Sequence, residues 1–168
     1  MERSRKAILV SHCLLNQSVR AIGAEKYPGV VKELVELCSE TGIAMLQLPC
    51  PQVEFGDGLD RKLKPKETYD TKHYRKNCRD LSKRILDSVE TYRGKNYDIL
   101  GIIGVEFSST CGVHQIANGS RNTPGKGILV EELENEMQKR NTQVPIIGFN
   151  LNNGFSSIEK LQSLFKFT

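Results

Sequence analysis

Short apolar runs alternate along the chain with stretches that repeat apolar residues at helical spacing. The apolar runs cover residues 7–10, 43–46, 98–105 and 144–149. The helical stretches cover residues 30–39, 69–93, 128–140 and 156–165. Runs this short and this apolar indicate strands that are buried on both faces, as in a parallel sheet. Alternating strands and helices with right-handed crossovers predict a Rossmann-like α/β three-layer sandwich, with about four parallel strands and helices on both faces.

Two long polar segments interrupt this alternation. Residues 51–66 exceed the length of an ordinary connection, which favours a functional loop. Residues 106–124 form a second long polar stretch, which we expect to be a loop. No internal repeat, low-complexity tract or linker divides the sequence, so we expect a single domain over residues 1–168.

The composition is that of a globular protein and narrows the possible partners. The formal net charge of +4 is compatible with an anionic small molecule but falls short of a nucleic-acid-binding signature. Nucleic acid is therefore an unlikely partner, although a thiolated tRNA or nucleotide stays open, as does the oligomeric state. No apolar run approaches the roughly 20 residues that cross a bilayer, so we expect no membrane association. Five widely spread cysteines without a secretory signal favour reduced thiols in the cytoplasm.

Three of the five cysteines follow predicted strands. Cys13, Cys50 and Cys111 come after the first, second and third strand, whereas Cys38 and Cys78 fall inside predicted helices and are expected to be ordinary helix residues. The carboxyl ends of parallel strands meet at one edge of the sheet, where open α/β folds bind their ligands. The placement of the three cysteines therefore predicts a metal site at that edge.

The residues alone leave two metals open for such a site. Zinc bound by three cysteines normally recruits a histidine, and His12 and His114 neighbour two of the cysteines. Soft thiolates also select iron–sulfur clusters. A cluster of four irons held by three thiolates keeps one iron open, and sulfur is the natural substrate atom for that iron.

Three short motifs, each centred on one of these cysteines, resemble the thiouracil desulfidase (TudS) family. The segment Val10–Arg20 reads VSHCLLNQSVR and is similar to the opening motif of that family, a Cys-Leu-Leu-Gly sequence followed after two residues by Val-Arg. Cys50 and Pro51 resemble its Cys-Pro-Glu motif, and the segment Ser108–Gly112 resembles its Ser-Pro-Ser-Cys-Gly motif. The motifs occur in the family's order and span most of the chain.

The resemblance implies a Rossmann-like fold that carries a 4Fe-4S cluster on Cys13, Cys50 and Cys111. It also implies the removal of sulfur from a thiolated nucleobase, with sulfide released and a carbonyl left behind. The sequence departs from the family at several positions. Asn16 stands where glycine is usual, residues 21–23 replace Tyr-Asp-Gly, and Gln52 occupies the usual glutamate position. We therefore expect a divergent desulfidase whose substrate is a small thiolated compound, thionucleobase-like but not fixed as thiouracil.

The expected reaction is a hydrolysis in which the open iron binds the substrate sulfur and water replaces that sulfur on carbon. It needs a base for water. Because Gln52 cannot ionise, Glu54 is the first candidate, with a solvated loop glutamate as the alternative. Glu106 is the second candidate, and it could equally be a structural carboxylate bonded to loop amides. Ser108 matches a family serine that could position water or substrate, unless it only bonds its own backbone.

Four further residues are predicted to bind substrate. Asn16 and Arg20 belong to the first motif, and the planar guanidinium of Arg20 could orient an anionic group. Lys126 and Gly127 begin a predicted helix whose amides suit an anion such as a phosphate, although a plain tight turn is the simpler interpretation. Two other functions stay open: a zinc-dependent hydrolase that uses the same three cysteines plus a histidine, and a non-catalytic module that binds metal or sulfide.

Overall fold

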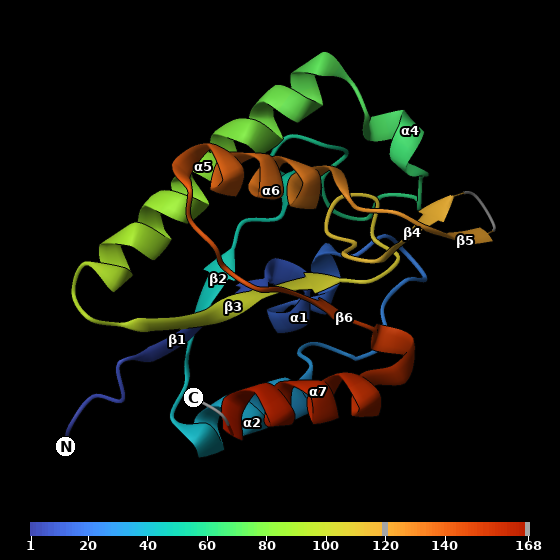
Figure 1. Ribbon diagram of the computed structural model, residues 1–168. Helices are drawn as coiled ribbons and strands as arrows, with labels where there is room; N and C mark the ends of the chain where they lie inside the picture. The colour runs from blue at the N-terminus through green and yellow to red at the C-terminus, as the bar shows by residue number, and fades with distance from the viewer. Residues whose placement is uncertain (119–120, 167–168) are drawn as a thin grey trace.

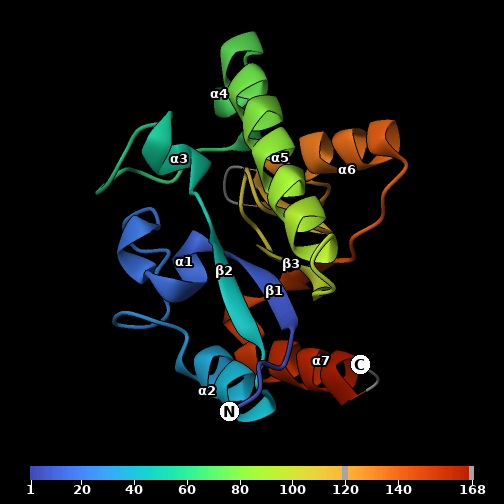
Figure 2. The same ribbon diagram turned by 90° about the vertical axis from the view of Figure 1, so that its left-hand side faces the viewer.

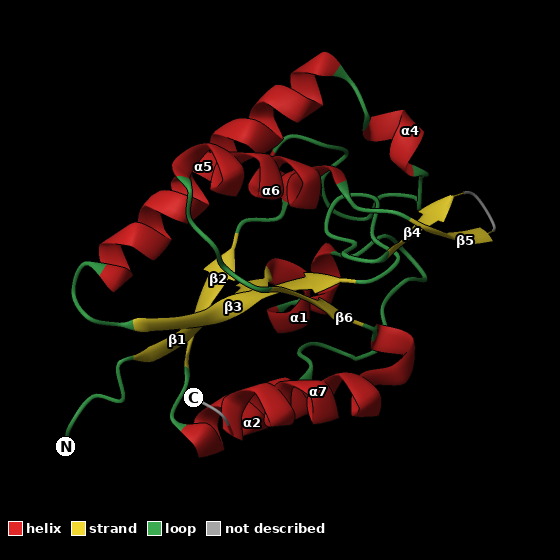
Figure 3. Cartoon of the chain, viewed as in Figure 1, coloured by secondary structure: helices red, strands yellow, loops and turns green. Residues whose placement is uncertain are grey.

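Four parallel strands form the central sheet of the protein. The computed structural model describes residues 1–118 and 121–166. The strands are β1 (Lys6–Ser11), β2 (Ala44–Leu48), β3 (Asp98–Val105) and β6 (Ile146–Phe149), in the spatial order β2-β1-β3-β6. Every neighbouring pair in this sheet is parallel (Figure 3). The predicted Rossmann-like fold is confirmed.

Two helices cover each face of the sheet. Helices α5 (Lys72–Arg93) and α6 (Ile128–Arg140) lie on one face, and α2 (Lys32–Thr41) and α7 (Gly154–Lys166) lie on the other (Figures 1 and 2). Successive side chains of β1 alternate between two buried clusters, with Ala7 and Leu9 packing towards α5 and α6, and Ile8 and Val10 towards α2 and α7. This two-residue period explains why residues 7–10 of β1 are apolar at every position.

The helix expected over residues 69–93 is divided in the structure. A short helix α4 (Lys66–Tyr69) precedes α5, which begins at Lys72. Thr71 separates them because its backbone is extended and its hydroxyl accepts a hydrogen bond from the amide of Tyr74 at 3.1 Å. Threonine is a typical N-cap residue. Because its side chain accepts a hydrogen bond from an amide in the first turn of α5, a new helix begins here, and the helix expected from the apolar pattern is divided at Thr71.

The two long polar segments contain short elements that the sequence pattern does not reveal. Residues 51–66 begin with the one-turn helix α3 (Pro51–Glu54). The segment expected to be a loop at 106–124 contains an antiparallel hairpin of β4 (Gln115–Asn118) and β5 (Arg121–Pro124). The remaining short elements are α1 (His12–Leu15), η1 (Gln17–Val19) and η2 (Leu151–Asn153).

The strand order creates a topological switch point between β1 and β3. The chain leaves β1 towards β2 through α2, on one face, and leaves β3 towards β6 through α6, on the other face (Figure 1). The loops after β1 and β3 therefore diverge and leave a crevice at the carboxyl edge of the sheet, where open α/β folds bind ligands. No helix in the described part of the chain is long and apolar enough to cross a membrane.

Candidate metal centre

A cavity opens at the carboxyl edge of the sheet between the loops that follow β1, β2 and β3. Cys13 from α1, Cys50 at the start of α3, and Cys111 from the loop after β3 all line it. All three are half-buried free cysteines. The structure therefore brings the three predicted ligands to one cavity, whereas Cys38 and Cys78 are buried inside α2 and α5, as expected.

The three thiols affect one another electrostatically. Burial is the largest cause that raises the pKa of Cys13 and of Cys111 above the ordinary value. The neighbouring thiols raise both pKa values further, Cys50 acting on Cys13, and Cys50 and Cys13 acting on Cys111. Arg20 opposes this effect because its Nη1 lies 3.7 Å from the Sγ of Cys13 and lowers the pKa of that thiol. Three thiolates this close together need added positive charge, which a bound metal would supply.

The loop that carries Cys111 is fixed from two sides. Ser108 Oγ accepts hydrogen bonds from the amides of Thr110 at 3.2 Å and of Cys111 at 3.0 Å. The first amides of α6 donate to carbonyls of the same loop, from Gly127 to Gly112 at 2.8 Å and from the next two residues to Ser109 and Thr110 at 3.2 and 3.0 Å. The helix start thus holds the cysteine loop in place.

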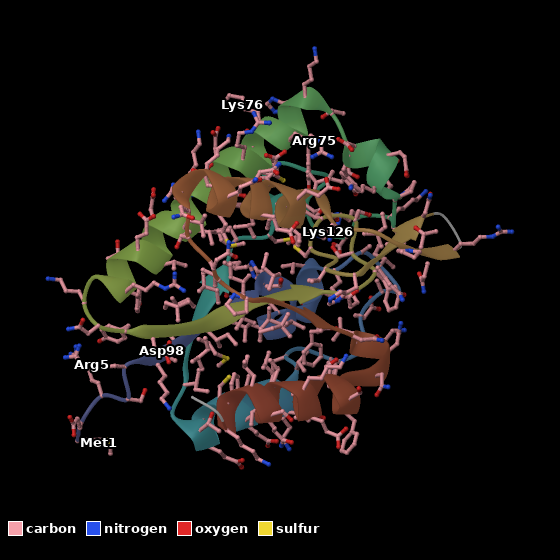
Figure 4. All side chains as sticks on the ribbon, in the orientation of Figure 1. Met1, Arg5, Arg75, Lys76, Asp98 and Lys126 are labelled. Atoms are coloured by element: carbon pink, nitrogen blue, oxygen red, sulfur yellow. The ribbon has the colours of Figure 1, made fainter. Side chains whose placement is uncertain are left out.

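This arrangement corrects the predicted anion site at Lys126 and Gly127. The amides that would hold an anion already donate to the Cys111 loop. The start of α6 and the Cys111 loop approach each other so closely that position 127 requires glycine, since a Cβ there would lie 2.2 Å from backbone atoms of Thr110. Lys126 lies just before α6 (Figure 4). It is exposed, and its Nζ pairs with Glu134 at 2.7 Å, outside the cavity. Neither residue lines the cavity.

Neither predicted carboxylate base faces the cavity. Glu54 is exposed at the end of α3, and its carboxylate points towards Arg84 of α5 at 3.8 Å. Glu106 is buried, and its carboxylate accepts hydrogen bonds from the amides of His114 and Gln115, the shortest at 2.8 Å. The alternative interpretation of Glu106, a structural carboxylate bonded to loop amides, describes its position. The prediction that either glutamate activates water therefore has no geometric support.

The other predicted site residues divide between the cavity and its walls. Asn16 caps η1 by accepting a hydrogen bond from the amide of Ser18 at 3.1 Å, and it does not line the cavity. Arg20 and Ser108 do line it. The hydroxyl oxygen of Ser108 accepts hydrogen bonds from amides of the Cys111 loop, which agrees with the alternative that this serine bonds its own backbone. Its hydroxyl proton remains available to donate.

Sequence reasoning missed a buried polar network that joins the three loops. Arg61 donates from Nε to Gln52 Oε1 at 2.5 Å and from Nη1 to the carbonyl of Val19 at 2.6 Å. Gln52 Nε2 donates to Thr110 Oγ1 at 2.9 Å, and Tyr74 shares a hydrogen bond with the same oxygen. The glutamine at the family's glutamate position was the available signal for Gln52. No sequence signal pointed to Arg61, because it begins the basic stretch 61–66, and such a stretch usually indicates a solvated surface.

The ionisable side chains that line the cavity, apart from the cysteines, are basic. Within the described part of the chain, the lining includes His12, Arg20, Arg61 and Lys64 but no aspartate or glutamate. Apolar side chains that include Val19, Ala21, Leu63 and Leu129 form much of the remaining wall. The cavity is therefore suited to a group or ligand that carries negative charge.

The described residues contain no group of three or more His, Cys, Asp or Glu side chains that could hold one metal ion. Thiolates on a single zinc lie about 2.3 Å from the ion and so within about 5 Å of one another. The expected zinc site, with three cysteines and a histidine, is therefore not supported, and His114 instead contacts Glu106 with Nδ1 at 3.2 Å. A cluster in which each thiolate binds a different iron tolerates wider spacing of the thiolates.

A comparison with solved structures supports the fold. The 4Fe-4S-dependent thiouracil desulfidase TudS aligns with 94% of this chain and 99% of its own, with a TM-score of 0.53 and 21% identity. At this identity the likeness shows a shared fold.

A comparison with curated proteins gives a nearer relative. No family model matches the chain. The uncharacterized protein MJ0003 of Methanocaldococcus jannaschii is 34% identical over 147 residues, which cover 88% of this chain and 87% of that protein. Because this identity extends over most of both lengths, the chain belongs to the same protein family as MJ0003.

Proposed function

We propose that this protein is a desulfidase that removes sulfur from a small thiolated compound and carries a 4Fe-4S cluster on Cys13, Cys50 and Cys111. One observation carries the proposal: three cysteines from three different loops line one cavity at the switch point of the sheet. The shared fold with a 4Fe-4S-dependent thiouracil desulfidase supports the same conclusion.

The donor set fits such a cluster. Cys13, Cys50 and Cys111 are free and half-buried, and Cys50 is close enough to the other two to raise the pKa of both, so the three form a set of soft ligands in one place. Arg20 favours the thiolate form of Cys13, the form that ligation requires. When bound, the cluster would supply a Lewis-acid position for the sulfur of the substrate.

The chain's own residues orient the ligands and the substrate. Arg20 stabilises the Cys13 thiolate through Nη1, while its Nε donates to the carbonyl of Ala24 at 2.8 Å and fixes the guanidinium. Ser108 holds the Cys111 amide, and the apolar wall excludes water from the face of a flat ring. These contacts position a thiolated heterocycle with its sulfur towards the cysteines.

His12 is our candidate for the proton transfer that hydrolysis requires. It is the one imidazole among the described residues that line the cavity, and no carboxylate lines it. An imidazole exchanges protons near neutral pH, which suits a base that takes a proton from water. His12 precedes Cys13 in α1, so the same short helix presents a ligand and the proposed base.

The test is cluster content together with sulfide release. The chain is purified anaerobically, reconstituted with iron and sulfide, and assayed for iron, acid-labile sulfide, visible absorbance and sulfide release from thiolated bases, nucleosides and acids. We expect about four irons per chain, and loss of both cluster and activity in Cys13→Ser, Cys50→Ser and Cys111→Ser.

Cys38→Ala is the matched control, because Cys38 is a buried cysteine of α2 that does not line the cavity. It should retain the iron and the activity. A colourless protein that binds one zinc ion would contradict the cluster. Undiminished sulfide release in all three cavity variants would contradict the proposed role of the cysteines.

A further inference from the structure

Arg61 is a buried cation in the wall of the cavity. Its side chain lines the cavity, yet the residue is only 9% exposed. Its hydrogen bonds run from Nε to Gln52 and from Nη1 to the carbonyls of Val19 and Gly58. All three acceptors are uncharged oxygens, and the hydroxyl of Tyr69, a further uncharged group, also interacts with the guanidinium.

No carboxylate among the described residues is dedicated to this charge. No carboxylate of the described chain forms an ion pair with Arg61, and none lines the cavity. The nearby carboxylate of Asp57 is bonded to Lys64 at 2.6 Å and to the hydroxyl of Tyr69 at 3.1 Å. Arg61 also lowers the pKa of Asp57, though less than Lys64 does, so this one carboxylate faces two cations and one positive charge remains.

The cysteines do not account for Arg61 either. The cation next to a thiol is Arg20, 3.7 Å from Cys13, whereas the hydrogen bonds of Arg61 avoid all three cysteines. A buried charge that lacks an opposite charge is costly, and such a group is retained where a ligand completes it. A guanidinium presents a planar fork that matches the two oxygens of a carboxylate or phosphate.

We propose that Arg61 binds an oxyanion, a carboxylate or a phosphate, of the ligand that enters the cavity. If the protein is the desulfidase proposed above, its substrate is then an anionic thiolated compound rather than a neutral thiolated base. Gln52 permits this because its uncharged Oε1 orients the guanidinium without neutralising it. The glutamine at this position thus determines the charge that the ligand must carry.

The test is the affinity of the full chain for matched probes, measured by calorimetry before and after anaerobic reconstitution. Orotate is compared with uracil, and uridine 5′-monophosphate with uridine, so that each pair differs by one anionic group. We expect at least one anion to bind about tenfold or more tightly than its neutral partner, the scale of a charged hydrogen bond. The pair with the larger ratio tells carboxylate from phosphate.

Three variants separate the charge of Arg61 from its structural bonds. Gln52→Glu sets a carboxylate against Nε and keeps the arginine in place, and Thr110 can donate its hydroxyl proton to the new carboxylate. We expect Gln52→Glu and Arg61→Gln to reduce the ratio of affinities to near one. Lys62→Gln removes the same charge from an exposed neighbour outside the cavity and should leave the ratio unchanged.

Equal affinity for anionic and neutral probes in the native chain would overturn the proposal, as would undetectable binding of both anions. A preserved ratio in Gln52→Glu, with an unchanged circular dichroism spectrum, would overturn it too, even if Arg61→Gln failed to fold. The function proposed above fails separately, through absent iron or absent sulfide release. Anion preference without sulfide release, and sulfide release without anion preference, are therefore distinguishable results.

Discussion

Substitution of Gly127 by alanine tests how α6 holds the cysteine loop. The added Cβ would lie 2.2 Å from the carbonyl carbon and oxygen of Thr110, where ordinary contacts begin near 3.4 Å. The backbone of Gly127, at φ −70° and ψ 158°, is accessible to alanine, so the penalty is steric. Both contacting groups are backbone, so the Cys111 loop or the start of α6 must move.

The magnitude follows from the contacts that such a movement breaks. Overpacking costs about 1–3 kcal/mol, and each of the three hydrogen bonds between α6 and the loop contributes about 1 kcal/mol. We therefore expect Gly127→Ala to lower the free energy of unfolding by about 2–5 kcal/mol. Displacement of Cys111 should also lower the iron bound per chain after reconstitution.

Urea denaturation followed by circular dichroism measures the first effect, and iron analysis the second. Gly29→Ala is the matched control, because a Cβ at Gly29 meets nothing within 4 Å. It should change stability by no more than about 0.5 kcal/mol. If Gly127→Ala were as stable as Gly29→Ala and bound as much iron, the clamp between helix and loop would be refuted.

Three further changes test the electrostatics of the molecule. Burial raises the pKa of Cys38 to about 11, so the folded state keeps a proton that the unfolded state loses above about pH 9, and stability falls as the pH rises. Cys38→Ala should flatten this loss between pH 9 and 11 by up to about 3 kcal/mol in urea titrations, and an unchanged slope would contradict it. Glu106→Gln should lower the free energy of unfolding by about 1–3 kcal/mol and retain sulfide release. Glu54→Gln should change neither stability nor sulfide release. A hundredfold fall in kcat in either variant would restore that glutamate as the base. Arg20→Gln should slow the alkylation of Cys13 at a fixed pH, because Arg20 lowers the pKa of that thiol; an unaltered rate would exclude the contact.

Within a single short helix, sequence reasoning selected a side chain that does not line the cavity. Gln52 and Glu54 both belong to α3, and the chemistry favoured the glutamate because only it can ionise. The structure turns Gln52 into the cavity and Glu54 out to Arg84. In the next loop Arg61 faces inward and Lys62 is exposed, although the sequence presents them as one basic stretch. The single turn of α3 is too short to show a helical pattern in the sequence, and loop side chains follow no fixed period, so the direction of these four side chains could not be predicted.

The sequence by itself determined the alternation of strands and helices, the parallel sheet and the gathering of three cysteines at one edge. Those features follow from the spacing of apolar residues and from the handedness of parallel crossovers, which act locally or through chain topology. Only the tertiary structure decided that the amides of α6 are used by the Cys111 loop, that Glu106 is bonded to loop amides, and that Arg61 is buried without a carboxylate. These outcomes depend on which hydrogen-bond partners distant loops bring together, and that pairing is settled by packing rather than by any local run of residues.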